Sequence, residues 1–475
     1  MTPLSHDTSP TPAQYTVKFD ETGSVLVEGP GVERRSQIHT FFNDLGISLA
    51  FGALLPPHLA DLLDITVAVY VADRLCPRRP RGAPRAHLDE LWQRRLTVRL
   101  PLRGAAEWSP ARRTKLEALL GFLTDDEWTF KFTNERRELR SSETQASFLP
   151  DVPKGDVSAA LLSGGLDSLA GVVNELVKHP ERTIIAFSAR TNHRIGIYQR
   201  KQVRRLTELF GQRLRHVPVE LRIEDREPHA YDREDPSQRT RGFVFQIFGA
   251  VTAVVAGSRV LHVYENGIGA INLPYSLAQL GAQATRATHP ITVGLVSDLL
   301  SDVIGEPFRV TLPHQFTTKA EMCAVLHQTD IRSLIELTIS CDKFPQRVAG
   351  RPQCGICPSC LLTRQSLLAA GLRLPEESGR FRHDIYTISG PGAVARMYDY
   401  RVMSAQAGAL VIACASGDPW AALVRRYPIL FDVAADHIAR TRQDLRPDVV
   451  ALYARYSVEW QQFGACVRES IGMAA

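Results

Sequence analysis

An alternation of short apolar runs with longer amphipathic segments, between residues 157 and 264, constrains the fold of this chain most strongly. The apolar runs occupy 157–162, 183–187, 216–221 and 260–264. Between them, residues such as Leu169, Val172 and Leu176 recur at helical spacing on one face. Strands that alternate with amphipathic helices form βαβ units, whose parallel sheet is covered on both sides. The pattern predicts a doubly wound α/β fold.

The rest of the 475-residue chain divides around this region. Before it, the sequence predicts a disordered tail (1–14), a hairpin (15–28), helices (36–50, 57–75 and 110–122), strands (95–103 and 128–133) and a basic, Pro-rich connector (77–85). After it, helical patterns prevail at 393–415, 419–438 and 446–463. We therefore expect an N-terminal α+β accessory domain (1–150), the α/β domain (151–375) and a helical C-terminal extension (376–475).

Charge and hydropathy exclude several classes of protein. The 56 Lys and Arg residues exceed the 51 Asp and Glu residues by only five, so nucleic acid is not an expected partner. The longest apolar runs, such as 247–257, are too short to span a bilayer, and the N-terminus lacks the pattern of a signal peptide. We expect a soluble cytoplasmic protein without a membrane partner. The sequence sets no oligomeric state, and a homodimer stays open.

A pair of glycines follows the first apolar run, within Ser163-Gly164-Gly165-Leu166-Asp167-Ser168. Two glycines let the backbone approach an anion, and the next helix directs unpaired amides and its positive dipole end to the same point. The hydroxyls of Ser163 and Ser168 add two donors. No Lys follows the glycines as a Walker A loop would require. The string predicts a pyrophosphate-binding loop, in which Asp167 orients a metal ion or the loop, or only caps the helix.

Four of the eight cysteines form a second motif. Cys341, Cys354, Cys357 and Cys360 follow the pattern C-x12-C-x2-C-x2-C. Two overlapping C-x2-C turns and a fourth thiolate from the preceding segment suit a closed, tetrahedral structural zinc site. An iron–sulfur cluster uses the same ligands, so this spacing alone does not fix the metal.

Together, the two motifs resemble the PP-loop ATP pyrophosphatases, and among them the 7-cyano-7-deazaguanine synthases of the QueC family. The resemblance covers about residues 155–372 and includes Arg364 after the last cysteine. The wider architecture is similar to the QatC-type, QueC-like proteins of anti-phage defence systems. The chain departs from the QueC pattern in a longer gap after Cys341, in its two extra terminal parts, and in Ser188-Ala189-Arg190 where QueC has Tyr-Gly-Gln.

The resemblance implies a requirement for ATP and Mg²⁺. It places the β- and γ-phosphates over residues 163–168, with Asp167 and Ser168 in the reaction, and adenine at Phe187 and Ser188. It also makes Lys319, in Thr-Lys-x-Glu before the cysteines, the cation that neutralises leaving pyrophosphate.

Other polar residues are expected at the same edge of the sheet. Glu265 and Asn266 end the fourth apolar run, and in the strand order of a PP-loop domain they would face the phosphate loop. There Glu265 could accept hydrogen bonds from a guanine edge. Arg239 and Arg241 lie in a segment that resembles an Arg-containing QueC loop and could clamp a carboxylate or phosphates. His289 is a further candidate for the substrate cleft.

The resulting hypothesis is an ATP-dependent carbon–nitrogen ligase. It adenylates the carboxylate of 7-carboxy-7-deazaguanine and joins it to ammonia or to the N-terminal amine of a partner protein, within an anti-phage defence system. Three alternatives stay open: a 7-cyano-7-deazaguanine synthase, a tRNA-modifying PP-loop enzyme, and a nucleotide-binding scaffold without catalysis. The terminal extensions are expected to recognise a partner, because the small-molecule reaction needs neither.

Overall fold

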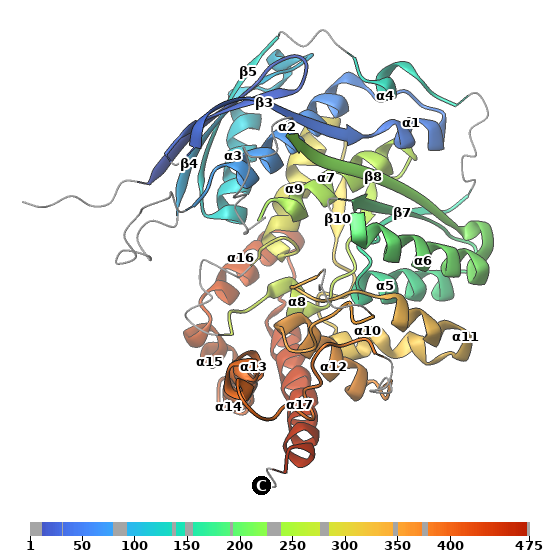
Figure 1. Ribbon diagram of the computed structural model, residues 1–475, viewed down its shortest axis with the longest axis vertical. Coiled ribbons are helices and arrows are strands. Elements are labelled where there is room, and N and C mark those ends of the chain that lie inside the picture. Colours follow the sequence, from blue (N-terminus) through green and yellow to red (C-terminus); the bar gives the residue numbers. More distant parts are fainter. Residues whose placement is uncertain are drawn as a thin grey trace, which may run out of the picture.

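The computed structural model describes residues 12–30, 32–78, 93–134, 139–147, 155–190, 193–225, 239–275, 285–344, 350–372 and 379–472. These residues form an α/β structure around one mixed, mostly parallel sheet (Figure 1). Its strands lie in the order β10-β9-β6-β7-β8-β3-β2-β1-β4-β5. The sheet is therefore continuous from the N-terminal part into the α/β part, and β3 and β8 are the antiparallel pair that joins them.

The α/β part contributes five parallel strands in the order β10-β9-β6-β7-β8. They are β6 (Val157–Leu161), β7 (Thr183–Arg190), β8 (Leu214–Asp225), β9 (Val260–His262) and β10 (Arg309–Thr311). The helices of this part are α5 (Leu166–Lys178), α6 (His193–Phe210), α7 (Arg241–Val255), α8 (Gly267–Ile271) and α9 (Pro290–Ile304). The chain order reverses between β6 and β9, and open α/β sheets bind ligands at such a reversal, outside the carboxyl ends of the strands.

Helices cover both faces of the parallel strands. Alternate residues of β7 enter different cores: Ile184 and Ala186 pack with α5, whereas Ile185 and Phe187 pack with α7. Both faces of β7 are therefore apolar, which explains why its sequence is a continuous apolar run rather than an alternating one.

The N-terminal part adds the other half of the sheet. Its strands are β1 (Ala13–Phe19), β2 (Ser24–Gly29), β3 (Val32–Asn43), β4 (Arg94–Pro101) and β5 (Glu127–Thr133). Its helices are α1 (Leu45–Phe51), α2 (Pro57–Leu75), α3 (Pro110–Thr124) and α4 (Ser141–Thr144). The predicted hairpin is confirmed as β1 and β2. Helix α2 is buried on nearly all sides, as its apolar sequence predicted.

Two predictions in this part were wrong. The helix expected at 36–50 is a strand, β3, followed by the short helix α1. Phe42 packs against the core while its neighbour Phe41 is exposed, which is the alternation of a strand rather than a helical stripe. The tail expected at 1–14 ends earlier, because β1 begins at Ala13; residues 1–11 lie outside the described residues.

The C-terminal part is helical, as predicted, but more divided. After α10 (Lys319–Cys323), α11 (Thr329–Arg332) and α12 (Pro358–Ala369) come α13 (Ala393–Arg396), α14 (Tyr398–Cys414), α15 (Pro419–Arg426), α16 (Ile429–Thr441) and α17 (Arg446–Ser470). Short 3₁₀ turns span Ala105–Glu107, Gly211–Arg213, Ala324–His327 and Ser333–Leu337. Pro428 separates α15 from α16, because proline has no amide hydrogen to continue a helix. The last helices share one apolar core with the cysteine segment.

Within the described ranges, no helix combines the length and apolar character needed to cross a membrane.

Candidate functional site

The Ser163–Ser168 string forms a turn between β6 and α5, at the edge where the strand order reverses. Gly164 has a φ of +93°, a conformation that favours glycine, and Gly165 is the N-cap of α5. The hydroxyls of Ser163 and Ser168 lie 3.0 Å apart across the turn. The first amides of α5 have no partner within the helix by position, so they point toward the turn. This geometry suits an oxyanion.

Side chains from other segments hold the loop from outside. Gln202 of α6 donates to the carbonyl oxygen of Gly164 (2.8 Å), and the amide of Ile339 donates to the same oxygen (2.9 Å). Gln199 donates to the carbonyl oxygen of Ser163 (3.2 Å). These bonds occupy loop carbonyls, which would repel an anion, and turn them away from the amides.

Four polar side chains meet beside the loop. The Nζ of Lys319 lies 2.7 Å from Oδ2 of Asp167, and both side chains are largely buried. Asn266 donates to Oδ1 of Asp167 (3.0 Å) and to Oε1 of Glu265 (2.8 Å). Strand β9 pairs with β6, so Glu265 and Asn266 face the loop as the expected strand order required. Gly269 makes room for this group, because a Cβ there would lie 2.3 Å from Oε1 of Glu265.

Interactions between the charges of this cluster shift the pKa values of Glu265 and Lys319. Burial, and then the negative charge of Asp167, raise the pKa of Glu265 to about 8, against the opposing effect of Lys319. Burial alone would lower the pKa of Lys319, but Asp167 and Glu265 outweigh it and hold that pKa above its ordinary value. Near pH 7, Lys319 is therefore an ammonium group and Glu265 is largely protonated.

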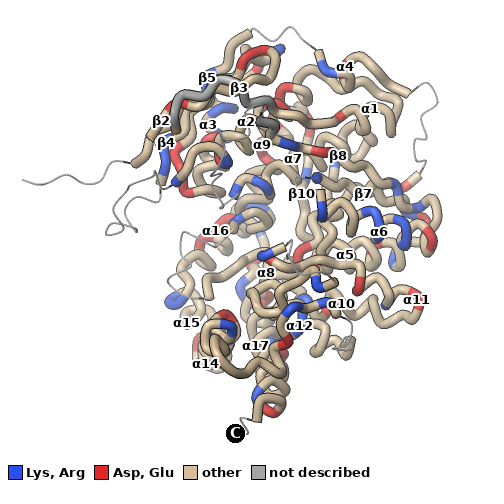
Figure 2. The backbone as a smooth tube through the Cα atoms, viewed as in Figure 1, with Lys and Arg blue, Asp and Glu red and all other residues tan. Residues whose placement is uncertain are grey.

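Helix α6 makes the surroundings of the loop positive. Arg194, Arg200, Lys201 and Arg204 are exposed along it, and Glu208 is its only acidic residue. Figure 2 shows several blue Lys and Arg positions along the tube of α6. They add a favourable long-range potential for an anionic ligand at the loop that this helix supports.

The end of β7 carries the two residues predicted to hold adenine. Phe187 is buried, and its carbonyl oxygen accepts from the amide of Leu162 (2.8 Å). The hydroxyl of Ser188 donates to the carbonyl oxygen of Leu162 (2.7 Å), so Nε2 of His216 must donate to Ser188 (3.0 Å). Burial, with help from nearby Arg190, lowers the pKa of His216 to about 4, which keeps the imidazole neutral.

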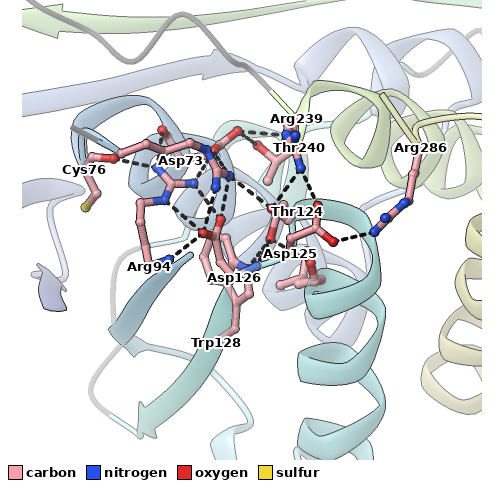
Figure 3. A network of polar contacts seen from close by, with 12 residues as sticks. Asp73, Cys76, Arg94, Thr124, Asp125, Asp126, Trp128, Arg239, Thr240 and Arg286 are labelled. Carbon is pink, nitrogen blue, oxygen red and sulfur yellow. Dashed lines mark hydrogen bonds and ion pairs between the residues drawn. The ribbon is translucent and has the colours of Figure 1, made fainter. Parts of the chain in front are cut away.

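Arg239 joins a buried network at the boundary with the N-terminal part (Figure 3). Its guanidinium group donates to Asp125 (2.7 Å) and to the carbonyl oxygen of Thr124 (3.1 Å) at the end of α3. Arg286 donates to the other oxygen of Asp125 (2.6 Å). The structure thus assigns Arg239 contacts that hold two parts of the chain together.

The core of the same network contains Arg94, whose guanidinium group lies 2.7 Å from both Asp73 and Asp126. Arg78 pairs with Asp126 as well (2.7 Å). The amide of Thr240, next to α7, donates to Asp73 (3.0 Å). Arg78 belongs to the predicted connector 77–85, of which residues 79–85 lie outside the described residues; Arg78 itself is buried rather than solvated.

Arg241 and His289 have different surroundings. Arg241 begins α7, is exposed, and lies over the ring of Phe245. His289 is the N-cap of α9, where its Nδ1 accepts from the amide of Ile291 (3.4 Å), and its ring packs against Phe122. Burial, and then Arg286, lower the pKa of His289 to about 3. The contacts of His289 are those of a buried helix cap.

The four cysteines converge on one point. All four Sγ atoms lie within 4.8 Å of one another, and three of the side chains are buried. Zn–S bonds of about 2.3 Å would place sulfurs about 3.8 Å apart in a tetrahedron, so the cluster is close to that geometry. Gly355 has a φ of +85°, and a Cβ there would lie 2.1 Å from the carbonyl oxygen of His383. The cluster could hold a structural metal such as zinc.

The cysteine cluster and the Ser163–Ser168 loop are neighbours. The amide of Leu166 donates to Oγ of Ser340 (3.2 Å), the residue directly before Cys341. The amide of Ser340 in turn donates to Oε1 of Gln353, the residue before Cys354 (2.9 Å). A metal that orders the cysteines would therefore also order one wall of the loop.

Sequence reasoning missed the side chains that support the loop. Gln199 and Gln202 are buried on the face of α6 that also carries Leu206. Two amides on an otherwise apolar stripe were the available signal, since buried polar groups need partners. Ser340 gave no such signal.

No family model matches the chain, and no curated protein matches it in sequence. The residues of the site themselves define the chemistry that it can perform. They combine amide donors at a helix start, a buried lysine, a carboxylate suited to a divalent cation, and a carboxyl group of raised pKa. Such a set can bind a polyphosphate and neutralise charge that develops when a phosphate bond breaks.

Proposed function

We propose that this chain is a QueC-like, ATP-dependent carbon–nitrogen ligase that acts on the carboxylate of a 7-deazaguanine such as 7-carboxy-7-deazaguanine. The observation that supports it most is the meeting of the SGGLDS loop, through its Asp167, with Lys319 and Glu265 at the carboxyl ends of β6 and β9. Two distant segments bring a cation and a second carboxyl group to an oxyanion loop, which a merely structural turn would not require.

In the proposed reaction, a carboxylate oxygen attacks the α-phosphorus of ATP and pyrophosphate leaves; an amine then attacks the activated carbonyl, and AMP and a proton leave. The protein positions the reactants and neutralises the negative charge that develops on the leaving pyrophosphate. The amides of Gly164, Asp167 and Ser168 would hold phosphate oxygens, and Lys319 would balance charge on pyrophosphate. Mg²⁺ is commonly held by one or two carboxylates plus substrate phosphates, and Asp167 fits that role.

Glu265 would recognise the deazaguanine. Its ionised carboxylate can accept from the ring N–H and the amino group of a guanine edge. Because its pKa is about 8, those two donors would have to favour the ionised form, so binding near pH 7 should release a proton. The zinc would be structural. As a cytoplasmic enzyme of an anti-phage system, the chain would take its amine from a partner protein, or use ammonia.

The direct test is a reaction with ATP, Mg²⁺, 7-carboxy-7-deazaguanine and ammonia, followed by mass spectrometry. We expect an amide with one equivalent of AMP, or a nitrile with two equivalents because dehydration of the amide needs a second ATP, and no product from the Asp167→Asn variant. Formation of AMP without a new deazaguanine product would mean that the acceptor amine is a different one. A wild-type enzyme that forms no AMP would contradict the proposal and favour a scaffold.

A further inference from the structure

The C-terminal helix α17 meets the site along one face. Leu452, Arg455 and Glu459 stand three and four residues apart, so they project from the same side of the helix. In Figure 1 this helix runs past α12 toward α8. Each of the three side chains contacts a segment that carries a residue of the proposed site.

Glu459 makes the most specific of these contacts. Its Oε1 accepts from the hydroxyl of Thr318 (2.6 Å) and its Oε2 from the side-chain amide of Gln365 (3.0 Å). Thr318 and Gln365 are both fully buried. A carboxylate that receives two buried donors is costly to lose, since both donors would be left without partners. Glu459 thus joins α17 to α12, the helix that contains Cys360, and to the residue before Lys319.

Arg455 contacts the chain on both sides of Thr318. Its Nε lies 2.8 Å from Oε1 of Glu321, and its guanidinium group also donates to the carbonyl oxygen of Phe316 (2.8 Å). Leu452 packs so closely on Gly267 that a Cβ on this glycine would lie 2.5 Å from Leu452. Gly267 directly follows Asn266, so α17 also touches the segment that carries Glu265.

The position of Lys319 depends on these contacts. Lys319 begins α10, a five-residue helix, and a helix this short is not stable on its own. A capping box between Thr318 and Glu321 closes its first turn. Both members of that box are held by α17, Thr318 through Glu459 and Glu321 through Arg455.

We propose that Glu459 is a positioning residue for Lys319, and that the C-terminal helix α17 is therefore required for the geometry of the site. Glu459 fixes the cap from which Lys319 reaches Asp167, and it ties that cap to the helix of the metal cluster. The inference rests on the proposed function only for what Lys319 does; where Glu459 places it is a separate claim.

The test measures the reactivity of the Lys319 amine in the full-length protein, without any nucleotide. An N-hydroxysuccinimide ester acetylates neutral, accessible amines, and peptide mass spectrometry gives the rate at Lys319. In the wild-type protein this rate should be low, because the side chain is 5% exposed and paired with Asp167. The exposed Lys201 provides an internal reference for the reagent.

Three variants test whether Glu459 controls the acetylation rate of Lys319. Glu459→Ala should raise the Lys319 rate about tenfold, and Glu459→Gln, which retains one acceptor, should give a smaller rise. Glu469→Ala is the matched control, since Glu469 is exposed on the same helix and should leave the rate unchanged. The buried Cys76 should stay unreactive toward a thiol reagent in each variant, which reports that the fold is intact.

A wild-type Lys319 rate in folded Glu459→Ala would overturn the inference; if that variant does not fold, a wild-type rate in Glu459→Gln would do so. Addition of ATP and Mg²⁺ separates this claim from the proposed function. We expect the nucleotide to slow acetylation of Lys319 in the wild-type protein. An effect of Glu459 without nucleotide protection would leave the positioning role in place and count against ATP as the ligand.

Discussion

Replacement of Glu265 by glutamine should remove a defined part of the pH dependence of stability. Burial and the charge of Asp167 raise the pKa of this carboxyl group from 4.5 to about 8 in the folded protein. Glutamine has the shape of the protonated acid and can keep the bond from Asn266. It therefore mimics the form of Glu265 that the fold favours, and it cannot ionise.

The sign follows from proton linkage. Between pH 4.5 and 8 the unfolded chain has released the proton that folded Glu265 still holds, so the free energy of unfolding falls as pH rises. The slope is at most about 1.4 kcal/mol per pH unit. Glu265 is partly exposed and shares its charge with Asp167 and Lys319, so the measured slope should be smaller.

Thermal melting of the wild type and of Glu265→Gln at pH 5 and at pH 8 measures this term. Titrating groups that do not interact with Glu265, such as His216, contribute equally to both proteins and cancel in the difference. We expect the melting temperature of Glu265→Gln, relative to that of the wild type, to be higher at pH 8 than at pH 5. A difference that does not change with pH would refute the assignment of a raised pKa to Glu265.

Three further predictions concern charge and metal. Lys319→Met leaves Asp167 without its cation and should lower the free energy of unfolding in urea by about 3–5 kcal/mol. Adding Asp167→Asn should restore part of that loss. A double variant no more stable than Lys319→Met would contradict the ion pair between Lys319 and Asp167. Cys357→Ser should abolish bound zinc in native mass spectrometry and lower the melting temperature, whereas retained metal would show that the cluster is not the site. Arg94→Met leaves Asp126 with less compensation in the buried network and should destabilise by about 3 kcal/mol or more; a loss below about 1 kcal/mol would argue against that network as an anchor.

The sequence predicted best what short segments determine. The turn at Gly164 and Gly165 depends on residues that are adjacent in the chain, and so does the bend at Gly355 in the cysteine motif. Strand β7 was found because an unbroken apolar run needs burial on both faces. The strand β3 was missed because Phe41 and Phe42 fit either a helical stripe or an alternating strand until β8 is known to lie beside them.

The rest of the site depends on contacts between distant residues. Leu166 and Ser340 are 174 residues apart, and Thr318 and Glu459 are 141 apart. The sequence around Ser340 or Glu459 does not indicate such a distant partner. Arg239 illustrates the converse: its motif suggested a ligand clamp, while the fold offers it Asp125 from the N-terminal part.

The central claim, that a carboxylate attacks the α-phosphorus of ATP at this site, is tested most directly by an oxygen label. The wild-type protein would be given 7-carboxy-7-deazaguanine with both carboxylate oxygens replaced by ¹⁸O, together with ATP, Mg²⁺ and ammonia. We predict that the AMP formed carries one labelled oxygen, transferred from the carboxylate. AMP without label, or no AMP at all, would contradict adenylation of the carboxylate.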